Sequence, residues 1–221
     1  MYKRQLLNKE VYVAEFPITE KEPLLQNLQK SGLLRPNTVL IQSPFNTDVY
    51  EDASVCVKRF AVSKHLFFSA FCKALGAKEV SVNQIELRNS RGLYKFDASG
   101  ERLGTTAELS AEKEDVEKLR SELVLKDVFD GGAPNIELAT EIINKHSLQN
   151  EPVMTSLLDA FTTTENPFKE RMLSLSLTSE VNKCLTIVAN LDIPAVIKIG
   201  ANYRQTFETQ TEYYLTLKVV F

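Results

Sequence analysis

Regular alternation of apolar and polar residues in the last quarter of the chain is the feature that most constrains its fold. Four short runs carry apolar side chains at every second position: 173–177, 185–191, 197–203 and 213–221. A repeat of two residues places each apolar set on one face of a β-strand. We therefore expect a strand-rich C-terminal block whose last strand buries Leu215, Leu217, Val219 and Phe221.

The second of these runs fits two kinds of secondary structure. Alternation over 185–191 predicts a strand, which is the interpretation we favour. A second apolar set within 179–191 has helical spacing instead, and comprises Val181, Leu185, Val188 and Leu191. A helix over this stretch is therefore the alternative.

Helices and strands are mixed in the rest of the chain. Alternation predicts strands at 10–16, 39–41, 53–57, 78–87, 93–98 and 105–109. Helical spacing predicts helices at 20–31, 64–75, 110–129 and 134–146, and another that follows Asn150 and reaches Phe161. Ser63 and Asn150 are the expected N-caps of two of these helices. A one-residue phase slip at Asn83 and Gln84 predicts a β-bulge.

The order of these elements predicts an α+β fold with a largely antiparallel sheet and amphipathic helices packed on one face. Short turns between alternating strands favour antiparallel pairing. The amphipathic helices before residue 162 need an apolar surface to cover. We expect a single domain over residues 1–221, with the polar linker at 162–167 as a candidate sub-boundary.

Charge, apolar runs and cysteine usage restrict the classes of function. The formal net charge of −3 gives no global electrostatic reason to expect nucleic-acid binding. Residues 1–10 lack the apolar core of a signal peptide, and no stretch reaches the roughly 18 apolar residues of a transmembrane helix. Cys56, Cys72 and Cys184 lie amid apolar residues, which predicts buried free thiols and a cytoplasmic location.

Motifs that would mark catalysis or cofactor binding are absent from the sequence. It contains no Walker-type phosphate loop, GxGxxG fingerprint, GxSxG elbow, HExxH pair or CxxC pair. His65 and His146 lie near the ends of predicted helices, where a histidine has ordinary structural roles. We therefore predict no catalytic residue, no cofactor and no metal site.

A basic cluster in the predicted 78–109 meander is the main candidate for an interaction site. It comprises Arg88, Arg91, Lys95 and Arg102, with the ring of Tyr94 among them. Basic and aromatic side chains together can contact phosphates and stack on bases. Alternatively, Lys and Arg protect a sheet edge from aggregation. Phe221 is a further candidate, because a terminal strand at a sheet edge can pair with a partner.

Three functional hypotheses follow. The first is a non-enzymatic interaction or scaffold protein, a subunit of a cytoplasmic assembly, that binds a protein partner or self-associates through a sheet edge. The second is a hydrolase or nuclease whose site is not visible from motifs. The third is a membrane-active or pore-forming protein that uses the C-terminal strands. The sequence favours the first, and it favours neither nucleic acid nor membrane as a partner.

Overall fold

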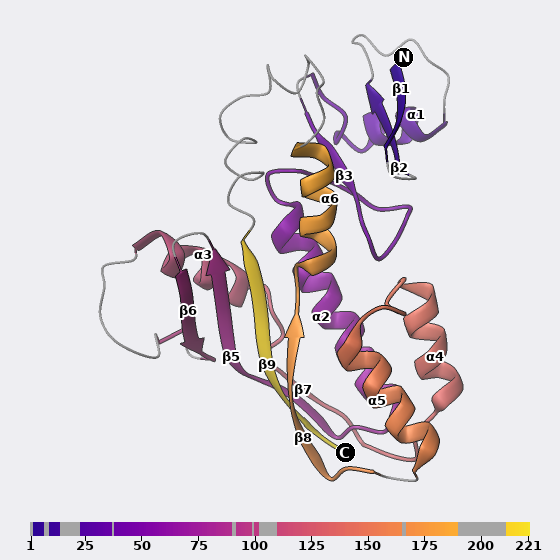
Figure 1. Ribbon diagram of the computed structural model, residues 1–221, viewed down its shortest axis with the longest axis vertical. Helices are drawn as coiled ribbons and strands as arrows, with labels where there is room; N and C mark the ends of the chain where they lie inside the picture. Colours follow the sequence, from indigo (N-terminus) through magenta and orange to yellow (C-terminus); the bar gives the residue numbers. More distant parts are fainter. Residues whose placement is uncertain are drawn as a thin grey trace.

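The protein has an α+β fold, as its sequence predicts, and Figure 1 shows its arrangement. The computed structural model describes residues 2–6, 9–13, 23–36, 38–89, 92–98, 100–101, 110–164, 167–189 and 211–221. The strands in these ranges are β1 (Tyr2–Leu6), β2 (Lys9–Val13), β3 (Leu40–Gln42), β4 (Tyr50–Asp52), β5 (Glu79–Asn89), β6 (Gly92–Asp97), β7 (Lys126–Val128), β8 (Glu170–Ser176) and β9 (Glu212–Val220). The helices are α1 (Pro23–Lys30), α2 (Cys56–Ala74), α3 (Ser110–Arg120), α4 (Ile136–Lys145), α5 (Pro152–Thr163) and α6 (Ser179–Ala189).

A five-stranded antiparallel sheet joins the middle of the chain to its end. Its strands follow the order β6-β5-β9-β8, and β7 pairs with the start of β5. β8 and β9 come after the 162–167 linker, yet they share this sheet with β5 and β6. The expectation that the last strand lies at a sheet edge is wrong, because β9 is paired on both sides.

The predicted bulge is present in β5. The register of the β5–β9 ladder shifts between Val82 and Gln84. An extra residue there reverses the alternation, so that Val80 and Ile85 are both buried although their positions differ in parity. The phase slip in the sequence therefore keeps a single face of β5 in the core.

The core lies between one face of this sheet and the helices. On β9, Leu215, Leu217 and Val219 have no exposed surface, as predicted. Phe221 is only partly buried and packs against the rim of the same cluster. The opposing aromatic side chains come mainly from α2 and are also fully buried: Phe60, Phe68 and Phe71.

Helix α2 begins earlier than its sequence indicates. The prediction of a strand at 53–57 is wrong, because β4 ends at Asp52 and α2 begins at Cys56. Ser63 is not an N-cap; it lies within the helix, where its hydroxyl donates to the main-chain oxygen of Arg59 (3.0 Å). The buried residues Cys56 and Phe60 extend the apolar stripe of the helix toward its N-terminus, and this burial outweighs the local alternation.

The favoured strand at 185–191 is also wrong, and the helical alternative is correct. Residues Ser179–Ala189 form α6, and Val181 and Leu185 are buried one turn apart. Alternation and helical spacing share several of the same apolar positions here. Packing on α2 decides between them, because Val181, Cys184 and Leu185 are all buried, and a strand would turn Cys184 and Leu185 to opposite faces.

The predicted helix at 110–129 is too long. Helix α3 ends at Arg120, and Lys126–Val128 form β7, which pairs with Glu79–Ser81 of β5. The main-chain oxygen of Leu125 accepts a hydrogen bond from the N–H of Val82 (2.8 Å). Pairing with the sheet therefore replaces the last helical turns.

The remaining predictions are correct in part. The N-cap of α5 is Glu151 rather than Asn150. β2 overlaps the strand predicted at 10–16, and α1 lies within the helix predicted at 20–31. The sequence did not indicate β1, which pairs with β2, or β4, which pairs with β3. The predicted strands at 105–109 and 197–203 lie outside the described residues. Across the described ranges, no helix has the length and apolar content that crossing a membrane requires.

Truncating a central core side chain tests this arrangement. We expect Leu217→Ala to lower the free energy of unfolding by about 3 kcal/mol, because the fully buried side chain leaves a cavity. The adjacent Lys218→Ala, on the outer face of β9, should cost less than about 1 kcal/mol. Urea unfolding of both variants provides the measurement. Equal losses would contradict the assignment of the two faces.

Candidate functional site

Two residues of the predicted basic cluster meet on the outer face of the sheet. Arg88 lies on β5 and Lys95 on β6, and both approach the carboxylate of Glu86. The distances are 3.4 Å from Arg88 Nη2 and 3.7 Å from Lys95 Nζ. The Arg88 guanidinium also lies 5.3 Å from the centroid of the Tyr214 ring. These cations are therefore paired with an acid and an aromatic ring of the same face.

Tyr94, another predicted member, does not lie beside them. Tyr94 lies on the opposite face of β6, opposite Leu87, and is only 7% exposed. Its parity differs from that of Lys95, so it cannot stack on a ligand bound beside Arg88. Arg91 and Arg102 lie outside the described residues. Among the described members, Arg88 and Lys95 thus share one face and Tyr94 lies on the other.

Phe221 contributes to packing at the end of β9. Its ring centroid lies 4.8 Å from that of Phe161 on α5. Its main-chain N–H donates to the oxygen of Lys169 (3.0 Å), just before β8. Phe221 therefore fixes the junction of β8, β9 and α5.

The outer face of the sheet carries further ion pairs between neighbouring strands. Lys126 Nζ lies 2.8 Å from Glu79 Oε2, and Lys218 Nζ lies 2.9 Å from Glu170 Oε2. Burial raises the pKa of Tyr214, and its hydrogen bond to Glu212 raises that pKa further. Among the described residues, acidic and basic side chains alternate on this face and form no patch of one sign.

The edge strand β8 presents main-chain groups away from the sheet. The N–H of Leu177 donates to the oxygen of Tyr213 (2.8 Å), and that of Phe221 donates to the oxygen of Lys169 (3.0 Å). With the observed register, odd-numbered residues of β8 form the hydrogen-bonded pairs with β9. The N–H and C=O groups of Met172 and Ser174 therefore point away from β9, and both residues are exposed.

The core is less completely covered at β8 than at β6. The inward-facing Leu173 on β8 is only half-buried, whereas its partner Leu217 on β9 has no exposed surface. At the opposite edge, Phe96 on β6 is 1% exposed. Between these two edge strands, β8 thus exposes more of the apolar layer.

A buried ion cluster lies at the junction of α2, α5 and α6. Lys64 on α2 has no exposed surface, and its Nζ donates to Glu151 Oε2. It also lies 2.9 Å from both carboxylate oxygens of Glu180. Glu151 is the N-cap of α5 and accepts from the N–H of Val153 (3.4 Å), while Glu180 lies in the first turn of α6.

The chemistry of this cluster is that of a structural clamp. The ammonium hydrogens of Lys64 are committed to carboxylate oxygens, and the side chain is enclosed by the three helices. Each carboxylate belongs to the N-terminal end of its helix, where the helix dipole also favours a negative charge. The cluster therefore fixes α5 and α6 on α2 and offers no free nucleophile.

One feature of the sequence indicates that Lys64 is buried. Lys64 lies four residues after Phe60 and four before Phe68, which places it on the apolar stripe of α2. No spacing rule connects Lys64 with Glu151 or Glu180, because both lie on other helices. Sequence reasoning therefore missed the cluster.

A second polar connection fastens β7 to α2. His65 Nε2 donates to the main-chain oxygen of Val124 (2.8 Å), and the Ser69 hydroxyl donates to Asp127 Oδ2. His65 is 1% exposed, and its Nδ1 has no hydrogen-bond partner within the described residues. Burial holds the pKa of His65 below its ordinary value of 6.5.

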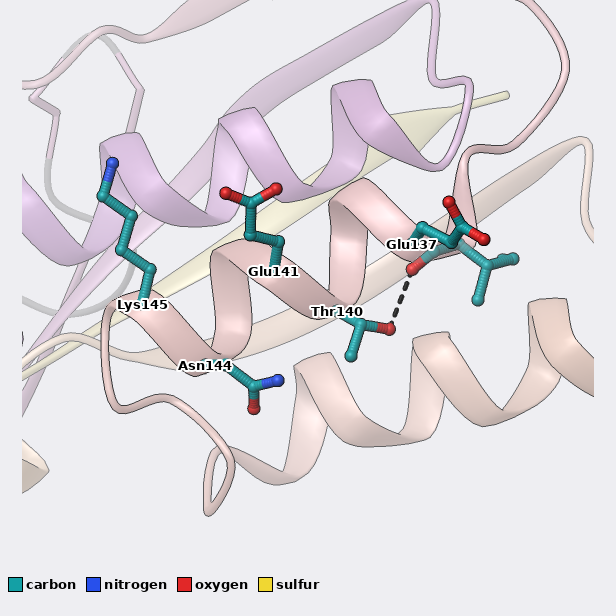
Figure 2. A pocket seen from close by; sticks show the side chains of 6 residues that line it. Glu137, Thr140, Glu141, Asn144 and Lys145 are labelled. Carbon is teal, nitrogen blue, oxygen red and sulfur yellow. Dashed lines mark hydrogen bonds between the residues drawn. The ribbon is translucent and has the colours of Figure 1, made fainter.

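A shallow hollow of about 660 Å³ lies over α4 (Figure 2). All of its lining residues belong to that helix, and they include Glu137, Glu141 and Lys145. Figure 2 shows Glu141 and Lys145 extending to one side of the helix and Asn144 to the other. These side chains do not converge on a common point. Among the described residues, no three His, Cys, Asp or Glu side chains gather as metal ligands would.

Comparison with known proteins found no match among protein-family models, curated proteins or solved structures.

The ion cluster is tested by removing its cation. We expect Lys64→Met to lower the free energy of unfolding by about 3–5 kcal/mol, because two carboxylates lose their buried partner. Lys58→Met on the same helix is the matched control. It breaks a partly exposed pair with Glu122 and should cost less than about 1 kcal/mol. Adding Glu151→Gln and Glu180→Gln to Lys64→Met should restore part of the loss in urea unfolding, and a further loss instead would contradict the clamp.

The buried histidine predicts a pH dependence of stability. Because the pKa of folded His65 is lowered, the unfolded chain binds a proton more readily, and stability should fall as pH decreases below about 6.5. The decline should continue down to the pKa of the folded state. His65→Gln retains a donor toward Val124 and should flatten the curve. His146→Gln is the comparison, since burial also lowers the pKa of His146, which is less enclosed. The measurement is the free energy of unfolding in urea over this pH range. If its slope against pH is the same in His65→Gln as in the unmodified protein, the assignment of the pH dependence to His65 is wrong.

Proposed function

We propose that this chain is a non-enzymatic interaction protein, a subunit of a cytoplasmic assembly, which binds a protein partner at the β8 edge of its sheet. The observation that carries the proposal is the edge position of β8, which pairs with β9 alone among the described strands. Met172 and Ser174 direct main-chain donors and acceptors away from β9, and the half-buried Leu173 lies between them. Exposed main-chain groups beside apolar surface are typical of strand-mediated protein binding.

The cysteines support the cytoplasmic part of the proposal. Cys56, Cys72 and Cys184 are buried free thiols, as the sequence predicts. Burial raises the pKa of Cys56 to about 12, which keeps that thiol protonated and unreactive at neutral pH. Three free thiols are compatible with a reducing compartment. Within the described residues, no observation favours the hydrolase, nuclease or membrane alternatives.

Site-specific photo-crosslinking tests partner binding. A photoreactive phenylalanine analogue replaces Met172 in the full chain, expressed in its native cells, and irradiation is followed by mass spectrometry of the adducts. Leu66 on α2 is the matched control site, because it is 45% exposed and Met172 is 50% exposed. We expect one discrete protein adduct at position 172, several-fold stronger than any at position 66. Equal adducts at both sites, or none at 172, would contradict the proposal.

A further inference from the structure

We propose that β8 accepts an added β-strand, supplied by an extended segment of the partner that carries an acidic side chain two residues from an apolar one. This inference rests on the proposed function and specifies how the partner is recognised. It assigns the main-chain contacts to Met172 and Ser174 and the side-chain contacts to Arg171 and Leu173.

The main-chain geometry of β8 favours a strand as the ligand. The outward N–H and C=O groups of Met172 and Ser174 are separated by one residue, as in one side of a β-ladder. A strand placed there would pair with these groups and extend the sheet order to β6-β5-β9-β8 and the added strand. A globular surface without a free strand has no complementary row of main-chain groups.

Arg171 supplies the charge that selects an acidic side chain. It is half-buried on the inward side of β8, and its guanidinium lies 4.4 Å from the centroid of the Phe168 ring. Among the described residues, no carboxylate pairs with it, whereas Lys218 and Lys126 on the outer face each have one. Odd-numbered residues of β8 would form the close, non-hydrogen-bonded pairs with an added strand. An acidic side chain there would meet Arg171 directly.

Leu173 supplies the apolar part of the recognition. It follows Arg171 by two residues, so both side chains lie on the inward side of β8. Its half-buried surface continues the apolar layer formed by Leu175 and Leu217, which are fully buried. An apolar side chain two residues from the acidic one would cover this exposed part of the core.

The surrounding helices favour a single strand over a second copy of this chain. Figure 1 shows α4 and α5 on the side of β8 that faces away from β9. Pairing two β8 strands about a two-fold axis would bring this helical layer of one copy toward that of the other. A slender extended segment needs only the space beside the strand. Charge also favours the partner segment over a second copy. An antiparallel second β8 would place Leu175 or Leu173, not an acid, opposite Arg171.

A displayed peptide library tests the inference. The probe is a randomised library with alternating apolar and polar positions, and the full chain is the bait. We expect enrichment of peptides with Asp or Glu two residues from an apolar residue. Binding of the best synthetic peptide should slow hydrogen exchange at the amides of Met172 and Ser174. No enrichment, or enrichment without protection of these two amides, would overturn the inference.

Three substitutions sharpen the test. Ser174→Pro removes an outward N–H that β9 does not use, and should weaken peptide binding about tenfold, as expected for one lost hydrogen bond. Ser174→Ala keeps that N–H and should bind normally. Arg171→Glu should shift the selected peptides from acidic to basic residues, and it remains informative if the proline variant is unstable. Unchanged selection by Arg171→Glu would refute the role of Arg171.

The two proposals fail in distinguishable ways. If the Met172 crosslink captures a partner but Ser174→Pro captures it equally well, partner binding stands and strand addition fails. If no adduct forms at Met172 while library peptides still protect β8, the edge binds strands in vitro but the proposed function fails.

Discussion

Burial of a single face of the sheet beneath α2 is the constraint on which the structure depends. The inward residues of β9 meet the phenylalanine side chains of α2, and both sets are removed from water. A fully buried side chain of this size contributes about 1.5–3 kcal/mol. The bulge in β5, the position of β9 between two strands and the helical state of residues 179–189 all serve to maintain this contact.

The polar groups of α2 determine how the other elements attach to it. Lys64 forms ion pairs with Glu151 at the N-terminal end of α5 and with Glu180 at the N-terminal end of α6. His65 and Ser69, on a different side of the same helix, hold the segment that contains β7. One helix therefore combines apolar contact with the sheet and polar contact with its neighbours. Removing one partner of a buried ion pair is strongly destabilising, because it leaves the other charge buried without a partner.

The covered face also explains where interaction surface remains. Helices cover one face of the sheet. The other face carries ion pairs, such as those of Glu86 with Arg88 and Lys95. Because β9 lies inside the sheet, β8 is the edge strand among the described residues. The side chains of Met172, Ser174 and Leu173 on β8 are partly accessible to solvent. The candidate site thus follows from the order of strands rather than from a cluster of reactive side chains.

The sequence by itself determined the α+β class, the inward set of β9, the bulge at residues 83–84 and the burial of the cysteines, because each depends on local periodicity or composition. Tertiary structure decided the helix at 179–189, the early start of α2, the strand order and the Lys64 cluster. Alternation shows that a strand has an apolar face but does not specify its neighbours. Likewise, the partners of Lys64 lie 87 and 116 residues away, and only the packed fold brings them together.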